Sequence, residues 1–185
     1  KTPGLKVIYP AFPEDAKGLL CAAINDPNPV LFFEHKALYR SIYQDVSDDY
    51  FTVEIGKAAV LKEGSDISII SYGAGVHWAL DTLKKNPEIS ADLIDLRTLQ
   101  PLDVETIYTS VRKTGKVIFL QEDSLFGSIA SDVSALITEN CFESLDAPVK
   151  RVASIETPIP FQGELEKQYL PKHRFVDELK KLLNY

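Results

Sequence analysis

Methionine is absent from this chain of 185 residues, which begins with Lys1. Translation starts at methionine, yet here an apolar, strand-like run at residues 5–9 follows the first residue almost at once. We therefore expect an excised fragment whose natural beginning lies elsewhere. The alternative is that the initiator methionine was removed and that the chain lacks further methionines by chance.

Cysteine is also scarce, with only Cys21 and Cys141. Neither belongs to a Cys-x-x-Cys pair or to a metal-ligand spacing, and each lies within a helical apolar pattern. We predict two buried, unreactive thiols, which is compatible with a reducing compartment.

An excess of basic residues and a long apolar run are missing as well. Asp and Glu number 27 against 20 Lys and Arg, which gives a formal net charge of -7. Binding to nucleic acid or to an anionic membrane needs a basic face, so we expect neither partner. A membrane span needs roughly 18 or more apolar residues in a row, and no such run occurs. A secretory signal, with its basic start and apolar middle, is not recognisable either.

What the sequence does contain is an alternation of two hydrophobic periods. Short apolar, β-branched runs alternate with helical patterns, and Asp103 can cap one of the helices. The predicted strands are residues 5–9, 30–33, 58–62, 67–72, 92–96, 116–120 and 149–154, and the predicted helices are residues 14–24, 76–83, 104–111, 129–137 and 175–183. Strands that alternate with helices indicate βαβ units and a mostly parallel sheet covered on both faces.

The alternation is interrupted at residues 41–53, a polar stretch without a clear period, which we interpret as a linker. Residues 54–185 are predicted to form a three-layer αβα domain around a mostly parallel five-stranded sheet. Residues 1–40 supply only strand, helix and strand, which cannot cover a sheet on both faces. We interpret them as a β-α-β remnant of a preceding α/β domain.

The first candidate site lies between a predicted strand and helix. Gly73 and Gly75 could let backbone amides approach a phosphate there, and Asp95 follows at the end of the next strand. This pattern is the first half of a dinucleotide-binding fingerprint. The position of its third glycine is held by Trp78, whose indole prevents close packing of helix on strand. A tight turn that needs glycine for its own geometry is the favoured alternative.

A second candidate is a functional edge formed by His77, Glu122 and Asp123. Glu122 and Asp123 follow a buried strand, and ligands of open α/β sheets bind at the carboxyl ends of strands. His77 lies in the first turn of a helix, where it could bind an anion or donate a proton. Local capping, packing and ion pairing are the alternatives for all three. His35 and His173 lie in polar segments and have no evident partner.

Several strings taken together resemble one family. They are Ala-Lys-Gly-Leu-Leu at 16–20, Asn-Pro at 28–29, Phe-Phe-Glu at 32–34, Leu-Tyr-Arg at 38–40, Gly-Ser-Asp at 64–66, Ile-Asp-Leu-Arg-Thr-Leu at 94–99, Pro-Leu-Asp at 101–103, Leu-Asp-Ala-Pro at 145–148, Thr-Pro at 157–158 and Tyr-Leu-Pro at 169–171. In this order they resemble the C-terminal part of the beta subunit of the thiamine-dependent 2-oxoacid dehydrogenases. The most specific piece is the run from residue 94 to residue 103.

The resemblance implies a fold and a chemistry. Residues 1–40 match the end of a pyrimidine-binding domain, and residues 54–185 match a transketolase C-terminal-type domain. The family's first component decarboxylates a 2-oxoacid on thiamine diphosphate and passes the acyl group to the acyltransferase component. Its catalytic residues lie upstream, and the diphosphate and Mg²⁺ are held by the alpha portion. We therefore expect no catalytic or coenzyme-binding residue in this chain, which alone should be inactive.

Two family features can be carried over to residues of this chain. Ala23, Asp26 and Asn28 match a turn that contributes, mostly through carbonyl oxygens, to a structural K⁺ site in some members. An ordinary helix stop is the alternative. Asp146 and the terminal carboxylate of Tyr185 match the docking site for the subunit-binding domain of the acyltransferase, which would supply basic groups. The further partners implied are the alpha subunit, or alpha portion, and a second beta copy.

The chain departs from many relatives at residues 121–123, where it has Gln-Glu-Asp and they have His-Glu-Ala, and at residues 127–128, where it has Gly-Ser and they have Gly-Gly. The segments 33–40 and 183–185 resemble the branched-chain (2-oxoisovalerate) members more than the pyruvate members.

Rival interpretations are a pyruvate dehydrogenase, another transketolase-group enzyme such as a deoxyxylulose phosphate synthase, and a free-standing flavodoxin-like or dinucleotide-binding module with one sheet of about seven strands. The expected location is the cytoplasm of a bacterium, which we favour, or the mitochondrial matrix of a eukaryote.

Overall fold

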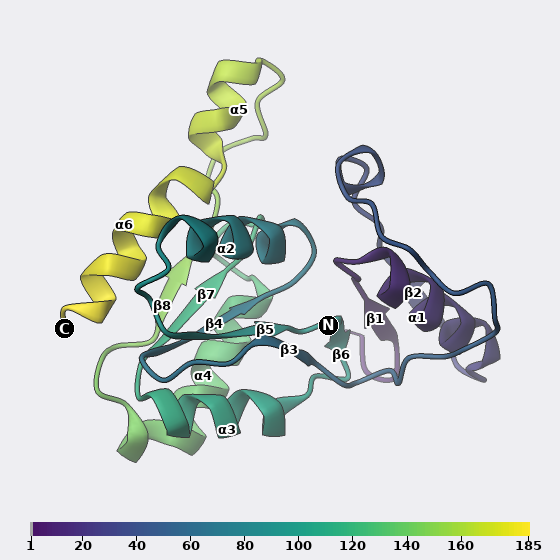
Figure 1. The fold of residues 1–185 in the computed structure, drawn as a ribbon, viewed down its shortest axis with the longest axis horizontal. Coiled ribbons are helices and arrows are strands. Elements are labelled where there is room, and N and C mark those ends of the chain that lie inside the picture. The colour runs from purple at the N-terminus through teal and green to yellow at the C-terminus, as the bar shows by residue number, and fades with distance from the viewer. Residues whose placement is uncertain (1) are drawn as a thin grey trace.

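The computed structural model describes residues 2–185 and contains two β-sheets of different size (Figure 1). In chain order the elements are β1 (Lys6–Ile8), α1 (Pro13–Asn25), β2 (Val30–Phe32), the 3-10 helix η1 (Leu38–Arg40), β3 (Ala59–Lys62), β4 (Ile67–Ser71), α2 (Ala74–Lys85), β5 (Ala91–Asp95), β6 (Thr98–Gln100), α3 (Val104–Thr114), β7 (Val117–Leu120), α4 (Ile129–Cys141), the 3-10 helix η2 (Phe142–Ser144), β8 (Lys150–Val152), α5 (Gly163–Tyr169) and α6 (Lys172–Leu183). Every strand and helix predicted from the sequence is present, with bounds shifted by a few residues.

The larger sheet has five strands in the order β3-β5-β4-β7-β8. Strand β4 runs parallel to β5 and β7, and β8 runs parallel to β7. Strand β3, at the edge, is antiparallel to β5. The prediction of a mostly parallel five-stranded sheet is therefore confirmed.

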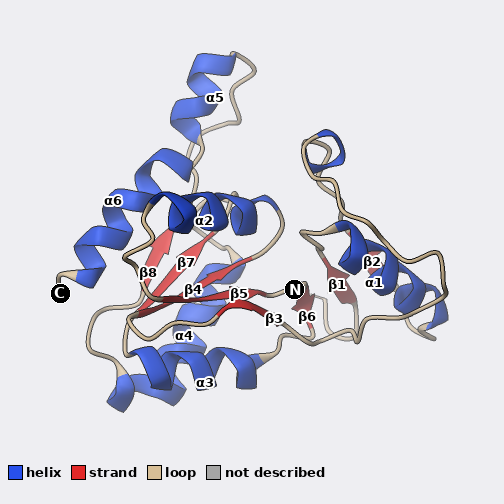
Figure 2. Ribbon diagram, in the orientation of Figure 1, coloured by secondary structure: helices blue, strands red, loops and turns tan. Residues whose placement is uncertain are grey.

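Helices cover both faces of this sheet, so the unit has three layers (Figure 2). Residues of β4 alternate between the faces: Ile67 and Ile69 pack with α2 and α6, while Ile70 packs with α3 and α4. Two fully buried aromatic rings mark the two sides, Phe175 of α6 on one and Phe119 of β7 on the other. Burial on both faces explains why β7 is a continuous apolar run.

Predicted details of the helices are borne out in part. The Asp103 side chain accepts a hydrogen bond from the Thr106 amide at 3.3 Å and so caps α3, as expected. It also accepts one from the Ala58 amide at 3.1 Å, which ties the start of the domain to this helix. Cys141 is buried, whereas Cys21 is only half-buried on α1.

The smaller sheet has the order β2-β1-β6. Strands β1 and β2 are parallel and are joined by α1, which is the β-α-β unit predicted for residues 1–40. Strand β6 was not predicted. It comes from the other unit and pairs antiparallel to β1, with Ile8 opposite Thr98. Because β1 and β2 do not join the larger sheet, the alternative of a single seven-stranded sheet is wrong.

The segment at residues 41–53 contains no helix or strand and folds back along α1. The Val53 amide donates to the carbonyl of Gly18 at 3.1 Å, and the Lys17 ammonium donates to the carbonyl of Asp49 at 2.9 Å. A Cβ atom at Gly18 would lie 2.5 Å from the Val53 side chain. Glycine at this position therefore permits the close approach of the segment to α1.

Helix α5 was also not predicted, and in Figure 1 it extends away from the body of the molecule beyond α6. Its flanking segment carries exposed apolar side chains, among them Ile159 and Phe161. Of the helices in residues 2–185, none has the length and apolar character that a membrane crossing requires.

Candidate functional site

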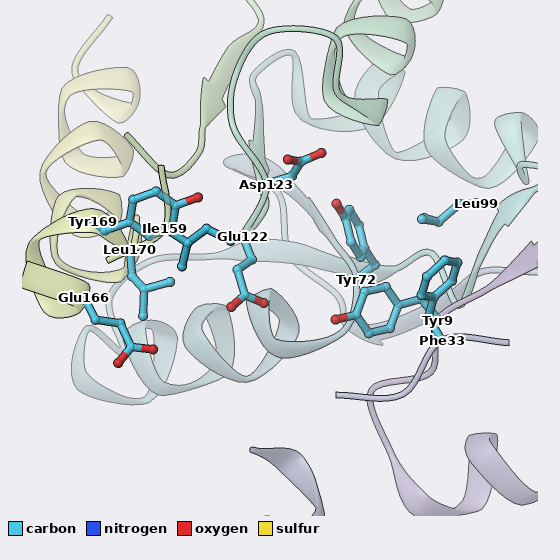
Figure 3. Close-up of a pocket in the computed structure, with 10 residues that line it drawn as sticks. All are labelled: Tyr9, Phe33, Tyr72, Leu99, Glu122, Asp123, Ile159, Glu166, Tyr169 and Leu170. Carbon is cyan, nitrogen blue, oxygen red and sulfur yellow. The ribbon is translucent and has the colours of Figure 1, made fainter. Parts of the chain in front are cut away.

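A cavity of about 370 Å³ lies where the carboxyl ends of strands from the two sheets face each other (Figure 3). Tyr9 follows β1, Phe33 follows β2, and Tyr72 follows β4. Two carboxylates, Glu122 and Asp123, come from the segment after β7. The remaining lining residues are Leu99, Ile159, Glu166, Tyr169 and Leu170.

Three rings form one wall of this cavity. The ring centroid of Tyr9 lies 5.4 Å from that of Tyr72 and 6.0 Å from that of Phe33. Burial, together with the charge of Glu122, raises the pKa of Tyr9 to about 12. The pKa of Tyr72 is raised as well, first by burial and then by Asp123. Both phenols therefore stay protonated at neutral pH and can donate hydrogen bonds.

Glu122 is paired with His35, whose Nε2 atom lies 2.9 Å from Oε2 of the carboxylate. The hydrogen bond to Glu122 raises the pKa of His35 against the opposing effect of burial. His35 Nδ1 is buried without a hydrogen-bond partner among the described residues. The expectation that His35 lacks a partner is therefore wrong, because folding brings it to a carboxylate 87 positions away.

The third residue of the predicted edge, His77, does not line the cavity. Its Nε2 atom lies 2.7 Å from the carbonyl oxygen of Ala11, and its ring packs on Phe12 at 4.9 Å between centroids. The residue thus links α2 to the loop before α1. His173 lies exposed on α6, away from this contact.

The glycines of the incomplete dinucleotide fingerprint have packing roles. Gly73 has a φ angle of +53°, and a Cβ atom there would lie 2.9 Å from the Tyr9 ring. A Cβ atom at Gly75 would lie 2.3 Å from Ser71 Oγ. The Asp95 carboxylate is fully buried and accepts a hydrogen bond from the Arg97 amide at 3.0 Å, so it is not exposed for binding to a ribose. These contacts favour the tight-turn interpretation.

The two residues predicted to bind a partner, Asp146 and Tyr185, line one surface groove of about 950 Å³. The Asp146 amide donates to the carbonyl of Gly115 at 2.8 Å, and Gly115, at φ +69°, leaves room for the aspartate side chain. The ammonium of Lys116 donates to the carbonyl of Leu183 at 2.8 Å, which holds the end of α6 beside the groove.

The three residues predicted for K⁺ lie together at the end of α1. The Asp26 carboxylate binds the Lys6 ammonium and accepts hydrogen bonds from the amide and side chain of Asn28 at 2.9 and 3.2 Å. The carbonyl of Ala23 accepts from the Asp26 amide. These contacts compete with a cation, so the set fits K⁺ poorly and the K⁺ site stays a prediction. Across residues 2–185, no three His, Cys, Asp or Glu side chains gather as a metal site would require.

The aromatic wall was missed by the sequence analysis, although a signal for it exists. Tyr9, Phe33 and Tyr72 each directly follow a strand, as Glu122 and Asp123 nearly do. The rule that ligands bind at the carboxyl ends of strands, applied to all predicted strands, would have selected these rings.

Comparison with known proteins identifies relatives over almost the whole chain. The pyruvate dehydrogenase E1 component subunit beta of Bacillus subtilis (strain 168) is 50% identical over 179 residues, 95% of this chain and 54% of that protein. The 2-oxoisovalerate dehydrogenase subunit beta of the same strain is 48% identical over 171 residues, 91% of this chain and 52% of that protein. The chain thus spans about half the length of the curated relatives it matches.

A solved structure described as a split gene transketolase, inactive beta4 tetramer, aligns with a TM-score of 0.78 at 27% identity, over 98% of this chain and 58% of that one. Residues 1–41 match the transketolase pyrimidine-binding domain, and residues 56–176 match the transketolase C-terminal domain. The resemblance to the beta subunits is confirmed, while pyruvate and branched-chain relatives are similarly close. The chain belongs to the transketolase C-terminal domain family, together with the beta subunits of 2-oxoacid dehydrogenases.

Proposed function

We propose that the chain is the C-terminal part of the beta subunit of a thiamine-dependent 2-oxoacid dehydrogenase, and that it serves subunit assembly and docking of the acyltransferase. The observation that carries the docking role is the shared groove of Asp146 and Tyr185. These residues are 39 positions apart in the sequence, and folding brings them to one concave surface. The name 'subunit beta' of the relatives supports assembly with an alpha subunit, and the beta4 tetramer of the similar transketolase supports contact with a second beta copy.

The groove combines charge with an apolar contact surface. The two carboxylate side chains, those of Asp146 and Glu139, outnumber the one guanidinium, that of Arg151. Phe142, at the start of η2, is 71% exposed there and offers an apolar anchor. A basic domain with an apolar side chain at its centre would complement this surface.

We expect Asp146→Asn, and separately removal of Tyr185, to weaken binding of the acyltransferase subunit-binding domain about tenfold each. A partner cation left without its carboxylate in a partly desolvated contact costs roughly 1.4 kcal/mol or more, which is a factor of about ten. Calorimetric titration of the chain with that domain measures the change. Raising the salt concentration should weaken the wild-type complex more than the complex of either variant. Salt screens the attraction between carboxylate and partner cation, and each variant lacks part of this attraction.

Asp48→Asn is the matched control for this experiment, since Asp48 is exposed in the linker and its loss removes the same charge. It should leave the affinity unchanged. Equal affinity of wild type and both groove variants would show that the groove is not the docking surface.

The division of the chain into residues 1–40, 41–53 and 54–185 is part of this proposal. The first range holds the end of a pyrimidine-binding domain, and the catalytic and Mg²⁺-binding residues of the coenzyme site lie in other parts of the enzyme. We therefore expect the chain alone neither to bind thiamine diphosphate tightly nor to decarboxylate a 2-oxoacid. Calorimetric titration with thiamine diphosphate and Mg²⁺ should show no saturable heat, and micromolar binding would contradict the assignment.

For the substrate we propose the branched-chain type, with 2-oxoisovalerate as the 2-oxoacid. The segments 33–40 and 183–185 support it, together with the 48% identity to a 2-oxoisovalerate dehydrogenase beta subunit. The pyruvate type is the second candidate, supported by the 50% identity to a pyruvate dehydrogenase beta subunit. Assembly of the complete enzyme and comparison of kcat/KM for the two 2-oxoacids decides between them.

A further inference from the structure

The cavity of about 370 Å³ is lined by residues that take no part in the proposed docking of the acyltransferase. Its wall of rings from Tyr9, Phe33 and Tyr72 faces the carboxylates of Glu122 and Asp123. Among the described residues that line it, none is Lys or Arg. Figure 3 shows the Glu122 carboxylate between the two tyrosine rings on one side and the α5 residues on the other.

This combination favours a positive charge over a neutral or negative one. Aromatic faces attract cations through their quadrupole, and carboxylates add a direct attraction in a partly desolvated space. The electrostatic influence of these carboxylates already contributes to the raised pKa values of both tyrosines. An anion, such as a phosphate, would be repelled by the lining carboxylates.

The remaining wall indicates that the cation is organic. Leu99, Ile159 and Leu170 present apolar surface, which contributes nothing to a hydrated metal ion but packs well against an alkyl chain. The volume of about 370 Å³ falls within the range of roughly 300–1,000 Å³ that is usual for small-molecule sites. Glu122 lines the cavity although it is paired with His35, and its side chain stays 39% exposed.

We propose that this cavity is a binding site for an alkylammonium group, held by the carboxylates of Glu122 and Asp123 and by the faces of Tyr9 and Tyr72. The group can belong to a free amine or to a lysine side chain of another protein, which share the same chemistry. The proposal goes beyond docking of the acyltransferase and does not depend on it, since the groove of Asp146 and Tyr185 is lined by different residues.

The test is titration of the chain with n-butylammonium chloride, followed by NMR shifts of the backbone amides around the cavity. Saturable binding in the millimolar range is expected, whereas n-butanol, the neutral analogue, should produce no saturable shift. Nα-acetyl-lysine methylamide is the second probe. An affinity equal to that of butylammonium assigns the site to lysine side chains, and a tenfold weaker one assigns it to free amines.

Two variants make the assignment specific. Glu122→Gln removes a charge but keeps an oxygen that can face His35, and Tyr72→Leu removes one ring; each should weaken butylammonium binding about tenfold. Glu88→Gln, at an exposed turn outside the cavity, should not change it. Circular dichroism checks that the variants are folded. Equal shifts with butylammonium and butanol, or unchanged affinity in folded Glu122→Gln, would overturn the proposal.

Discussion

Replacement of Phe175 by alanine is expected to lower the free energy of unfolding by about 3–5 kcal/mol, the usual cost of removing a large buried ring. Phe175 is fully buried and lies in the cluster between α6, α2 and the sheet. Its neighbours are held by strands and a helix that cannot close around the vacated space, so a cavity remains. Urea unfolding followed by circular dichroism measures the change.

Phe161→Ala is the matched control, because the same ring is removed from a side chain that is fully exposed before α5. Its effect should stay within about 0.5 kcal/mol. A loss below about 1 kcal/mol at Phe175 would mean that α6 contributes little to the stability of the domain. Packing of α6 on the sheet would then not explain why Tyr185, which follows this helix, lies at the groove.

The larger unit could be predicted from the sequence because its elements are long enough to show a period. Strand β4 is buried throughout and has three isoleucines among its five residues, since α-helices cover both of its faces. Helix α3 buries five residues, among them Ile107 and Val111, and begins at a capping aspartate. Local pattern and tertiary environment agree in these segments, so the pattern was sufficient.

Strand β6 and helix α5 could not be found in the same way. Strand β6 has only three residues, too few to show a period. It forms because the backbone of β1, about 90 positions earlier, is available for pairing. Helix α5 buries none of its residues and so has no apolar stripe. Its cap is Gln162, which accepts a hydrogen bond from the Leu165 amide at 2.9 Å, and glutamine is not among the residues preferred there.

In the candidate sites too, residues selected by their neighbours in the sequence could be predicted, whereas contacts made by distant segments could not. Glu122 and Asp123 could be selected because they follow a strand, and the position of strand ends is local information. The partner of Glu122, His35, comes from the other unit and could not be inferred from spacing. His77 lies in the first turn of a helix, as predicted, but its ring contacts the Ala11 carbonyl, which the sequence could not indicate.

A buried carboxyl outside both sites, that of Asp95, is expected to make the stability of the fold depend on pH. Burial raises the pKa of Asp95 to about 7, although the Arg97 amide bonded to it acts in the opposite direction. Its Oδ2 atom is buried without a hydrogen-bond partner among the described residues, as suits a protonated carboxyl. Arg97 is paired instead with Asp15 of α1, at 2.9 Å between Nη2 and Oδ1.

In the unfolded chain Asp95 loses its proton near pH 4, so between about pH 4 and pH 7 the folded state binds more protons. The free energy of unfolding therefore falls as the pH rises through this window, and the contribution of Asp95 levels off above pH 7. From pH 5 to pH 8 the decrease should be about 2–3 kcal/mol, since each pH unit in the window contributes about 1.4 kcal/mol.

Asp95→Asn should remove this part of the pH dependence, because asparagine keeps an oxygen for the Arg97 amide but does not titrate. Urea unfolding at pH 5 and pH 8 should show the variant losing about 2–3 kcal/mol less than the wild type over that interval. Asp45→Asn, at an exposed position of the linker, should follow the wild-type curve. Parallel pH profiles of wild type and Asp95→Asn would mean that Asp95 is already ionised in the folded protein at pH 5. Its charge would then have to be balanced by Arg97, which would share its guanidinium between Asp95 and Asp15 and so couple α1 to the larger unit.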